Sequence, residues 1–241
     1  MNIYAFVGSR RGKLSSTYQV ISRLISEIDK NIEIKKVQID TADSMNFHSC
    51  LGCCSCFSGG SCNLDKKDGM STTKTAIMES DIVILGTPVY AATVSGDTKI
   101  FIDRLSSWLH LMPLIGKVGV NVVSASNNHL FETSSYQKRM METMGLSVVR
   151  DILVTTDIPP MLSEPDFFDH VLPDHARIIT EYLDKKRKLI FSDYQQRYFQ
   201  NYRTKLLTQG DISNSEYMFW EKNSYFAVDS IADLVQDTGC C

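Results

Sequence analysis

Five of the chain's seven cysteines lie within one short segment. Four of them are spaced C-x2-C-x2-C-x5-C and a fifth lies inside that pattern; they are Cys50, Cys53, Cys56 and Cys62, with Cys54 as the additional thiol. Four closely spaced thiolates are the ligand set of a [4Fe–4S] cluster. The same thiolates could hold a tetrahedral zinc ion, or remain unligated as packing or redox-active groups. The spacing leaves these three alternatives open.

A segment rich in hydroxyl groups follows the first apolar run of the chain. Residues 3–7 have the pattern of a short strand, and Gly8 to Thr17 then lead into a helical pattern. In doubly wound sheets, ligands bind beyond the carboxyl ends of the strands, and the free amides of a helix N-terminus bind phosphate. The segment lacks the Rossmann and Walker glycine patterns. It therefore predicts a site for a phosphate monoester, with simple capping of the helix by Ser15 or Ser16 as the alternative.

A second loop follows residues 82–85, a fully apolar run typical of a strand buried on both faces. Residues 86–105 read GTPVYAATVSGDTKIFIDRL. Pro88 stiffens this loop, Tyr90 offers a flat face, and Gly96 allows backbone to approach a ligand. The loop is suited to a planar heterocycle that lies against the tyrosine ring.

Together the two loops closely resemble those of the NADPH-dependent FMN reductase family of flavodoxin-like proteins. The resemblance covers residues 1–155 and rests on a G-x-P-x-Y segment that runs through S-G into a K-x-F-x-D-R helix. The matching residues are Gly86, Pro88, Tyr90, Ser95, Gly96, Lys99, Phe101, Asp103 and Arg104, and the Gly116-Lys117 step matches as well. The resemblance implies an FMN at the carboxyl edge of a five-stranded parallel sheet.

The resemblance also assigns roles to residues by position. Those that would bind the FMN phosphate are Ser9, Arg11, Ser16 and Thr17. Those that would line the isoalloxazine are Pro88, Val89, Tyr90 and Ser95. A third loop, Ser124 to Asn128, departs from the glycines of many relatives but could still contact the polar edge of the flavin. We expect Arg104 and Asp103 to pair with each other and fix their helix.

The chemistry implied is that of the flavin, so no catalytic side chain is assigned. Flavin N5 would accept a hydride from NADH or NADPH and pass electrons to a small-molecule or peptide acceptor, or to an electron-transfer protein. The cysteine segment resembles that of iron–sulfur flavoproteins, in which a cluster exchanges electrons with FMN. Its acidic step to Met70 also occurs in relatives that are simple flavin reductases. The alternatives are an iron–sulfur electron carrier and, in another class, a flavin- or zinc-binding regulatory module without turnover.

Strand-like and helix-like patterns alternate along the first two thirds of the chain. The expected strands are residues 3–7, 32–39, 82–85, 118–123 and 146–154, and the clearest expected helices are residues 98–111, 131–144 and 174–189. Such alternation predicts the α/β class, with a doubly wound parallel sheet. We expect a flavodoxin-like FMN-binding domain over residues 1–156 and a helical extension over residues 157–241, divided by the break at residues 158–160.

The extension is rich in aromatic residues. Residues 191–226 hold ten of the chain's 23 aromatic residues, which argues against a disordered tail. We expect them to form an oligomerisation arm or a cover over the site. The resemblance implies a homodimer or homotetramer.

Composition limits the remaining classes of function. The net charge of −3 gives no reason to expect a nucleic-acid partner or an anionic membrane surface. No apolar run has membrane-spanning length, and the N-terminal residues do not have the pattern of a signal peptide. Cysteines crowded into one loop suit a reducing compartment, so we expect a cytoplasmic protein. Cys240 and Cys241 are expected to be an uninvolved end.

Overall fold

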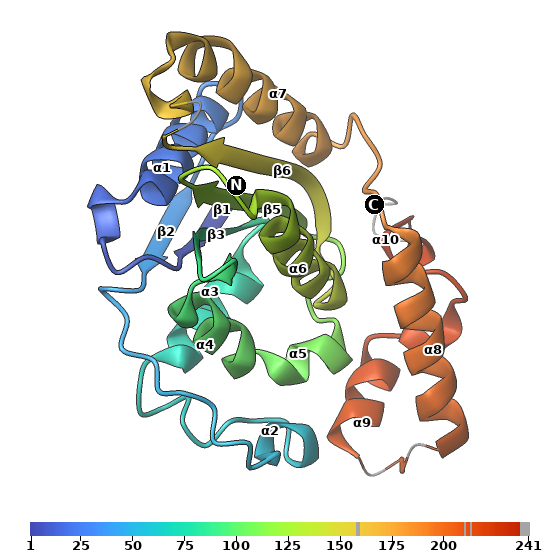
Figure 1. Ribbon diagram of the computed structural model, residues 1–241. Coiled ribbons are helices and arrows are strands. Elements are labelled where there is room, and N and C mark those ends of the chain that lie inside the picture. Colours follow the sequence, from blue (N-terminus) through green and yellow to red (C-terminus); the bar gives the residue numbers. More distant parts are fainter. Residues whose placement is uncertain (158–159, 210, 213, 237–241) are drawn as a thin grey trace.

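The sheet of this protein has five parallel strands with helices on both faces (Figure 1). The computed structural model describes residues 1–157, 160–209, 211–212 and 214–236. The strands are β1 (Asn2–Val7), β2 (Lys36–Thr41), β3 (Ile82–Tyr90), β5 (Val118–Ala125) and β6 (Ser147–Thr155), in the order β2-β1-β3-β5-β6. A two-residue strand, β4 (Thr93–Val94), pairs antiparallel with the end of β3. The order is that of flavodoxin-like sheets, as predicted.

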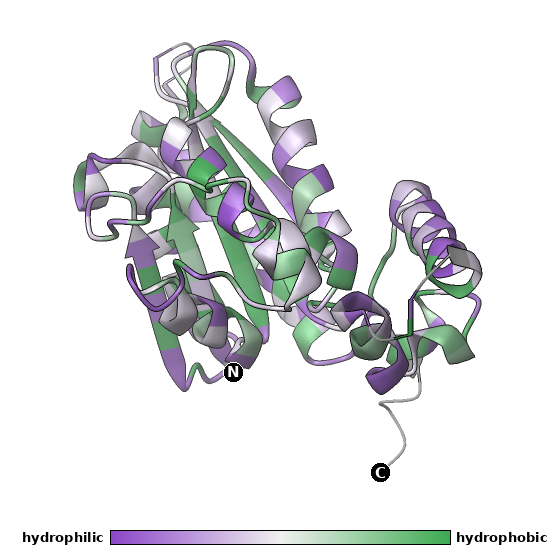
Figure 2. Cartoon of the chain, turned by 90° about the horizontal axis from the view of Figure 1, so that it is seen from below, coloured by the Kyte–Doolittle hydropathy of each residue, from purple (hydrophilic) through white to green (hydrophobic). Residues whose placement is uncertain are grey.

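The strands bury both of their faces because successive side chains point to opposite sides of the sheet. On one face, Ile3 and Val7 pack with α1 (Ser16–Asp29) and α7 (Leu172–Leu183). On the other, Tyr4 and Phe6 pack with a second group of helices. These are α3 (Met70–Glu79), α4 (Gly96–Arg104), α5 (Ser106–Leu111) and α6 (Leu130–Thr143). Figure 2 shows the hydrophobic strands lying between more polar helices.

The aromatic C-terminal residues form a core of their own beside α5. The elements there are α8 (Asp193–Gln209), α9 (Ser215–Lys222), the single turn η4 (Tyr225–Ala227) and α10 (Asp233–Gln236). Phe199, Trp220 and Tyr225 are buried in this core. Hydrogen bonds join it to the end of α5, among them those from Trp220 Nε1 to the His110 carbonyl at 2.9 Å and from Tyr225 Oη to the Met112 carbonyl at 3.1 Å.

Several element boundaries differ from the predicted ones. The second strand begins at Lys36 rather than residue 32; Lys36 is the partner of Asn2, the first residue of β1. The predicted helix 98–111 is broken at Leu105, which leaves the helical region of the backbone between α4 and α5.

Other helices also differ from the prediction. The helix predicted over residues 174–189 begins earlier, with proline in its first turn, and ends at Leu183, shortly before Lys185 takes a positive φ of 57°. A short π-helical turn, η3 (Phe167–Val171), precedes it, and η2 (Met161–Ser163) lies before that turn. The sequence did not predict α3, because few of its residues are apolar.

The predicted division of the chain after residue 156 stays a prediction. Beyond it, α7 packs on α1 as part of the sheet layers, whereas the aromatic core begins with Phe191. Residues 158–159 of the predicted break, and Cys240 and Cys241, lie outside the described residues. None of the helices in the described ranges combines the length and apolar character needed to cross a membrane.

Candidate functional site

The loop after β1 forms a tight hydroxyl-lined turn into α1. Ser15 caps the helix, since its Oγ accepts from the Tyr18 amide at 3.2 Å, as one of the sequence alternatives predicted. The side chain of Ser9 is buried, and its Oγ accepts from the Arg11 amide at 3.3 Å. Ser16 is half-buried and Arg11 is exposed. The amides of the first helical turn have no helical acceptor, so the loop retains the donors that a phosphate requires.

The loop after β3 turns sharply before α4. Pro88 and Val89 are half-buried, and Tyr90 exposes 51% of its surface. Ala91 and Ala92 follow with positive φ angles of 48° and 68°, which close the turn between β3 and β4. The tyrosine ring therefore lies at the surface of the carboxyl edge, where a planar ligand could reach it.

Ser95 holds this loop to the first one. It is buried, and its Oγ donates to the Gly8 carbonyl at 2.5 Å and accepts from the Thr98 amide at 3.2 Å as the N-cap of α4. Its own amide donates to Thr87 Oγ1 at 3.1 Å. The hydroxyl of Ser95 thus joins the two loops internally, although the resemblance implied that it lines the flavin.

The third loop is joined to the first through a buried pair of hydroxyl groups. Thr17 Oγ1 and Ser124 Oγ lie 2.6 Å apart, and both residues are buried. Residues 126–128 are exposed beyond them. The three predicted loops thus meet at the carboxyl edge of the sheet, as the strand order requires.

The cysteine segment follows β2 and contains one short helix, α2 (Ser55–Ser58). All five of its thiols are free; Cys50, Cys53 and Cys54 are exposed, whereas Cys56 and Cys62 are half-buried. Burial raises the pKa of Cys56, and the nearby Cys62 and Cys50 raise it further. Two of the other predicted ligands therefore lie within electrostatic reach of Cys56.

The fourth predicted ligand has a different partner. Cys53 Sγ lies 3.3 Å from Ser55 Oγ, and this hydrogen bond lowers the pKa of the Cys53 thiol. Across the described residues, His, Cys, Asp and Glu side chains form no group of three or more arranged to hold a metal ion. By the chemistry of its donors, four thiols on one short segment, the segment fits an iron–sulfur cluster or zinc.

Arg104, the last residue of α4, binds residues on both sides of the four spaced cysteines. Its side chain is fully buried. Nη2 donates to Asp65 Oδ1 at 2.8 Å and to Asp68 Oδ1 at 3.3 Å. Nη1 donates to the His48 carbonyl at 3.0 Å and also to Asp68 Oδ2. One guanidinium therefore binds a residue before the first cysteine and two residues after the last.

The predicted pairing of Arg104 with Asp103 is wrong. Asp103 pairs with Lys99, one helical turn earlier. A positive side chain at the end of α4 instead faces two carboxylates from a loop more than 30 residues earlier in the chain. The sequence analysis noted the acidic step to Met70, which begins at Asp68, but did not connect it or Asp65 with Arg104; the available signal was two carboxylates within six residues of the last spaced cysteine.

Both partners of this ion pair have shifted pKa values. Burial raises the pKa of Asp68, but hydrogen bonds from Arg104 and from the amides of His48 and Met70 outweigh it and bring the pKa down to about 2. Burial lowers the pKa of Arg104, whereas Asp68 and Asp65 raise it above its ordinary value. Both groups are therefore charged near neutral pH.

The C-terminal core also contacts the cysteine segment. Ser215 Oγ, at the start of α9, donates to the Phe57 carbonyl in α2 at 2.9 Å (Figure 1). The ring of Phe57 lies 4.7 Å from that of His110, whose Nδ1 is 2.7 Å from Glu216 Oε1. The extension therefore contacts the cysteine segment, while its role as a cover or an oligomerisation arm stays a prediction.

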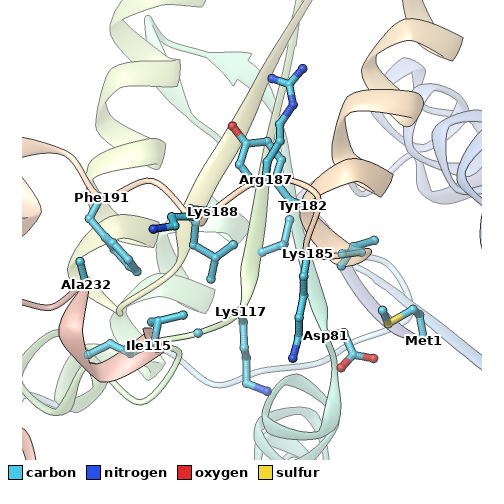
Figure 3. Close-up of a pocket in the computed structure, with 15 residues that line it drawn as sticks. Met1, Asp81, Ile115, Lys117, Tyr182, Lys185, Arg187, Lys188, Phe191 and Ala232 are labelled. Carbon is cyan, nitrogen blue, oxygen red and sulfur yellow. The ribbon is translucent and has the colours of Figure 1, made fainter. Parts of the chain in front are cut away.

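The structure also has a cavity of about 710 Å³, whose lining residues are drawn in Figure 3. It is lined by Met1, Asp81 and Lys117, which precede β1, β3 and β5, and so it lies at the amino edge of the sheet. Lys117 Nζ is occupied there by the carbonyls of Met78 and Ser80, at 2.8 and 2.7 Å. The cavity is separate from the site that the three loops form.

The sequence model of the NADPH-dependent FMN reductase family matches residues 1–158. The chain belongs to this family. It is accordingly an FMN-dependent oxidoreductase with a flavodoxin-like fold. The family match covers all three loops of the carboxyl edge and the cysteine segment that follows β2.

Curated proteins with similar sequences carry the name iron–sulfur flavoprotein. One, from Archaeoglobus fulgidus, is 27% identical over 227 residues, which are 93% of this chain and 100% of the relative. Another, from Clostridioides difficile, is 29% identical over 156 residues, 65% of this chain and 68% of the relative. The first of these similarities extends through the aromatic C-terminal region.

Solved structures share the fold at low sequence identity. The apo form of an NADH:FMN oxidoreductase has a TM-score of 0.53 at 16% identity, covering 74% of this chain and 87% of that protein. A flavone reductase has a TM-score of 0.60 at 12% identity, covering 80% of this chain and 66% of that protein. These similarities establish the common architecture of the sheet and its helices.

Proposed function

We propose that this FMN-dependent oxidoreductase accepts a hydride from NADH or NADPH and delivers electrons to a small-molecule, peptide or protein acceptor. The observation that carries the proposal is the junction of three loops at the carboxyl edge, joined by the Ser95–Gly8 and Thr17–Ser124 hydrogen bonds. FMN, when bound, supplies the hydride-accepting chemistry at N5. The protein residues bind it and fix its orientation.

In this proposal the first loop binds the FMN phosphate. Ser9, Ser16 and Thr17 offer hydroxyl groups, and the first-turn amides of α1 add donors with the positive end of the helix dipole. The Arg11 guanidinium is exposed beside them and supplies a charge for the phosphate dianion.

The second and third loops would hold the ring system. Pro88, Val89 and Tyr90 offer the apolar and aromatic surface, while Ser95 acts through the loop that it fastens. Ser124 contributes through its hydrogen bond with Thr17, which links the ring side to the phosphate side. A nicotinamide donor would approach the open face near Tyr90, which is half exposed.

We further propose a [4Fe–4S] cluster on Cys50, Cys53, Cys56 and Cys62. Support comes from the names of the curated relatives and from the short spacing of the four thiols, of which Cys62 and Cys50 both raise the pKa of Cys56. A cluster with four thiolates is anionic, and cationic side chains lie close to the thiols. The charge of Lys74 lowers the pKa of Cys56. Cys62 raises the pKa of Arg104, and Cys50 raises the pKa of Lys99. Bound zinc and free thiols are the other outcomes of the test below.

We also propose that the protein works as a homodimer or homotetramer in the cytoplasm. Large apolar side chains are exposed around the site: Leu14, Leu51 and Tyr90 in the loops and Phe131 in the first turn of α6 expose between 51% and 76% of their surface. Exposed apolar surface around a site is typical of a protein interface. Free thiols suit a reducing compartment. Light scattering after size exclusion tests the assembly, and a monomer would contradict it.

Reconstitution with FMN and rapid mixing test the proposed activity. Protein incubated with FMN should quench its fluorescence and retain it through gel filtration. Anaerobic mixing with NADH and with NADPH should then bleach the flavin absorbance within seconds, and the faster donor is the preferred one. Protein that binds FMN but is not bleached by either donor would indicate a regulatory module or an electron carrier reduced by another protein.

A further inference from the structure

One helix connects the flavin loops to the cysteine segment. The N-cap of α4 is Ser95, which is hydrogen-bonded to the Gly8 carbonyl, and its last residue is Arg104. Nine helical residues with a rise of about 1.5 Å each make α4 roughly 13 Å long. The helix is fixed to the sheet between its ends, because the ring of Phe101 stacks on Phe6 with centroids 4.0 Å apart. It is therefore a short rigid connection between two sites.

At its far end, α4 holds the cysteine segment by a single side chain. Arg104 uses both terminal nitrogens, and its partners are the carbonyl of His48 and the carboxylates of Asp65 and Asp68. Asp65 is additionally paired with Lys74 of α3 at 2.7 Å. Residues between these anchors are mostly exposed, so few other buried contacts hold the thiols in place.

The chemistry of this anchor depends on a guanidinium. Arginine presents several donors in one plane and stays charged when buried, whereas lysine has one ammonium and cannot span three acceptors on two sides. Removing the charge would leave two carboxylates at a buried site without their main partner, which is strongly unfavourable. The segment would then loosen rather than remain as it is.

We propose that Arg104 is a positioning residue that sets the place of the four thiols relative to the flavin edge. Its hydrogen bonds to Asp65, Asp68 and the His48 carbonyl hold both ends of the cysteine segment against α4. Because Ser95 fixes the other end of α4 to the flavin loops, the helix sets the position of the segment relative to those loops. The proposal rests on the proposed function for its redox meaning. The attachment of the cysteine segment to α4 by Arg104 involves only residues of this chain.

The first test is made on metal-free protein loaded with FMN. Hydrogen exchange of residues 48–68 is compared among wild type, Arg104→Lys and Arg104→Gln. A matched control is Arg177→Gln, because Arg177 on α7 also binds two carboxylates, Asp174 and Glu181, but at the exposed surface. Arg104→Gln should speed exchange in the segment by about tenfold or more, with Arg104→Lys intermediate, while the control leaves it unchanged.

The second test follows the redox centres after cluster reconstitution. Arg104→Lys should shift the midpoint potential of the cluster and broaden its EPR signal, whereas the FMN dissociation constant stays within about twofold of wild type. If Arg104→Gln fails to fold, the paired variant Arg104→Gln with Asp68→Asn removes one of the unpaired charges and serves in its place.

Two results would overturn the proposal. One is unchanged exchange of residues 48–68 in both Arg104 variants. The other is loss of FMN in parallel with the segment in Arg104→Lys, which would make Arg104 a support of the whole fold. Wild-type protein that binds no iron would contradict the proposed cluster instead, and the exchange comparison would still decide the role of Arg104.

Discussion

Replacement of Gly8 by alanine tests whether the two main loops form one site. A Cβ at this position would lie 1.7 Å from Thr98 Oγ1 and 3.0 Å from Ser95 Oγ. Thr98 cannot move aside freely, since it is fully buried and its Oγ1 is hydrogen-bonded to Ser95 Oγ at 2.9 Å and to Thr87 Oγ1 at 3.0 Å. The added methyl group must therefore separate the loops.

The expected loss follows from these contacts. Overpacking of a tight site costs about 1–3 kcal/mol, and each buried hydrogen bond that breaks adds about 1 kcal/mol. We expect Gly8→Ala to lower the free energy of unfolding by about 3 kcal/mol. Because the Ser95–Gly8 hydrogen bond joins the phosphate and ring sides, FMN affinity should fall by about tenfold or more, equivalent to about 1.4 kcal/mol.

The assays are urea unfolding and FMN fluorescence quenching, with Gly96→Ala as the matched control. Gly96 is the first residue of α4, and a Cβ there would meet no atom within 4 Å. As the control for the unfolding measurement, alanine at this position should add up to about 1 kcal/mol of stability. Gly8→Ala protein with the stability and FMN affinity of wild type would refute the reasoning.

Three further substitutions test separate parts of the structure. Asp68→Asn should remove about 2 kcal/mol of stability at neutral pH, because the pKa of Asp68 is held at about 2 against an ordinary 3.8. In urea unfolding, this difference from wild type should shrink as the pH falls from about 4 to about 2. A difference that stays constant with pH would contradict the prediction. Trp220→Ala should lower the stability by about 3–5 kcal/mol in thermal unfolding, because the ring is fully buried. The FMN affinity measured by titration at low temperature should be unchanged, and loss of FMN binding would place the C-terminal core in the flavin site. Thr17→Val should lower the stability by about 1–2 kcal/mol, because it leaves Ser124 Oγ without its hydrogen-bond partner at 2.6 Å. Thr17→Ser should retain most of the stability. Equal losses of stability in the two variants would assign the effect to packing.

The sheet was predictable because its strands have a strong local signal. The runs at Ile3–Val7 and Ile82–Leu85 are apolar on both faces, and each is followed by a loop of small and hydroxyl residues. Parallel strands place the ends of such loops at one edge, so the meeting of the three loops followed from strand order. The family resemblance added which ligand the loops would take.

The contacts of Arg104 were not predictable in the same way. Its neighbour Asp103 is the obvious partner in sequence, but adjacent residues on a helix point in different directions, and Asp103 reaches Lys99 instead. The carboxylates of Asp65 and Asp68 approach Arg104 only because α3 and α4 pack on the same face of the sheet. Long-range packing of this kind leaves no periodic signal in a single sequence.

The absorbance and EPR spectra of anaerobically purified protein test the central claim most directly. The account predicts the two absorbance bands of a flavin, release of FMN on denaturation, and a broader iron–sulfur absorbance whose EPR signal develops on reduction. Flavin bands without the iron–sulfur signal would remove the cluster from the account. Protein that has no flavin as purified and takes up no FMN on incubation would contradict the account itself.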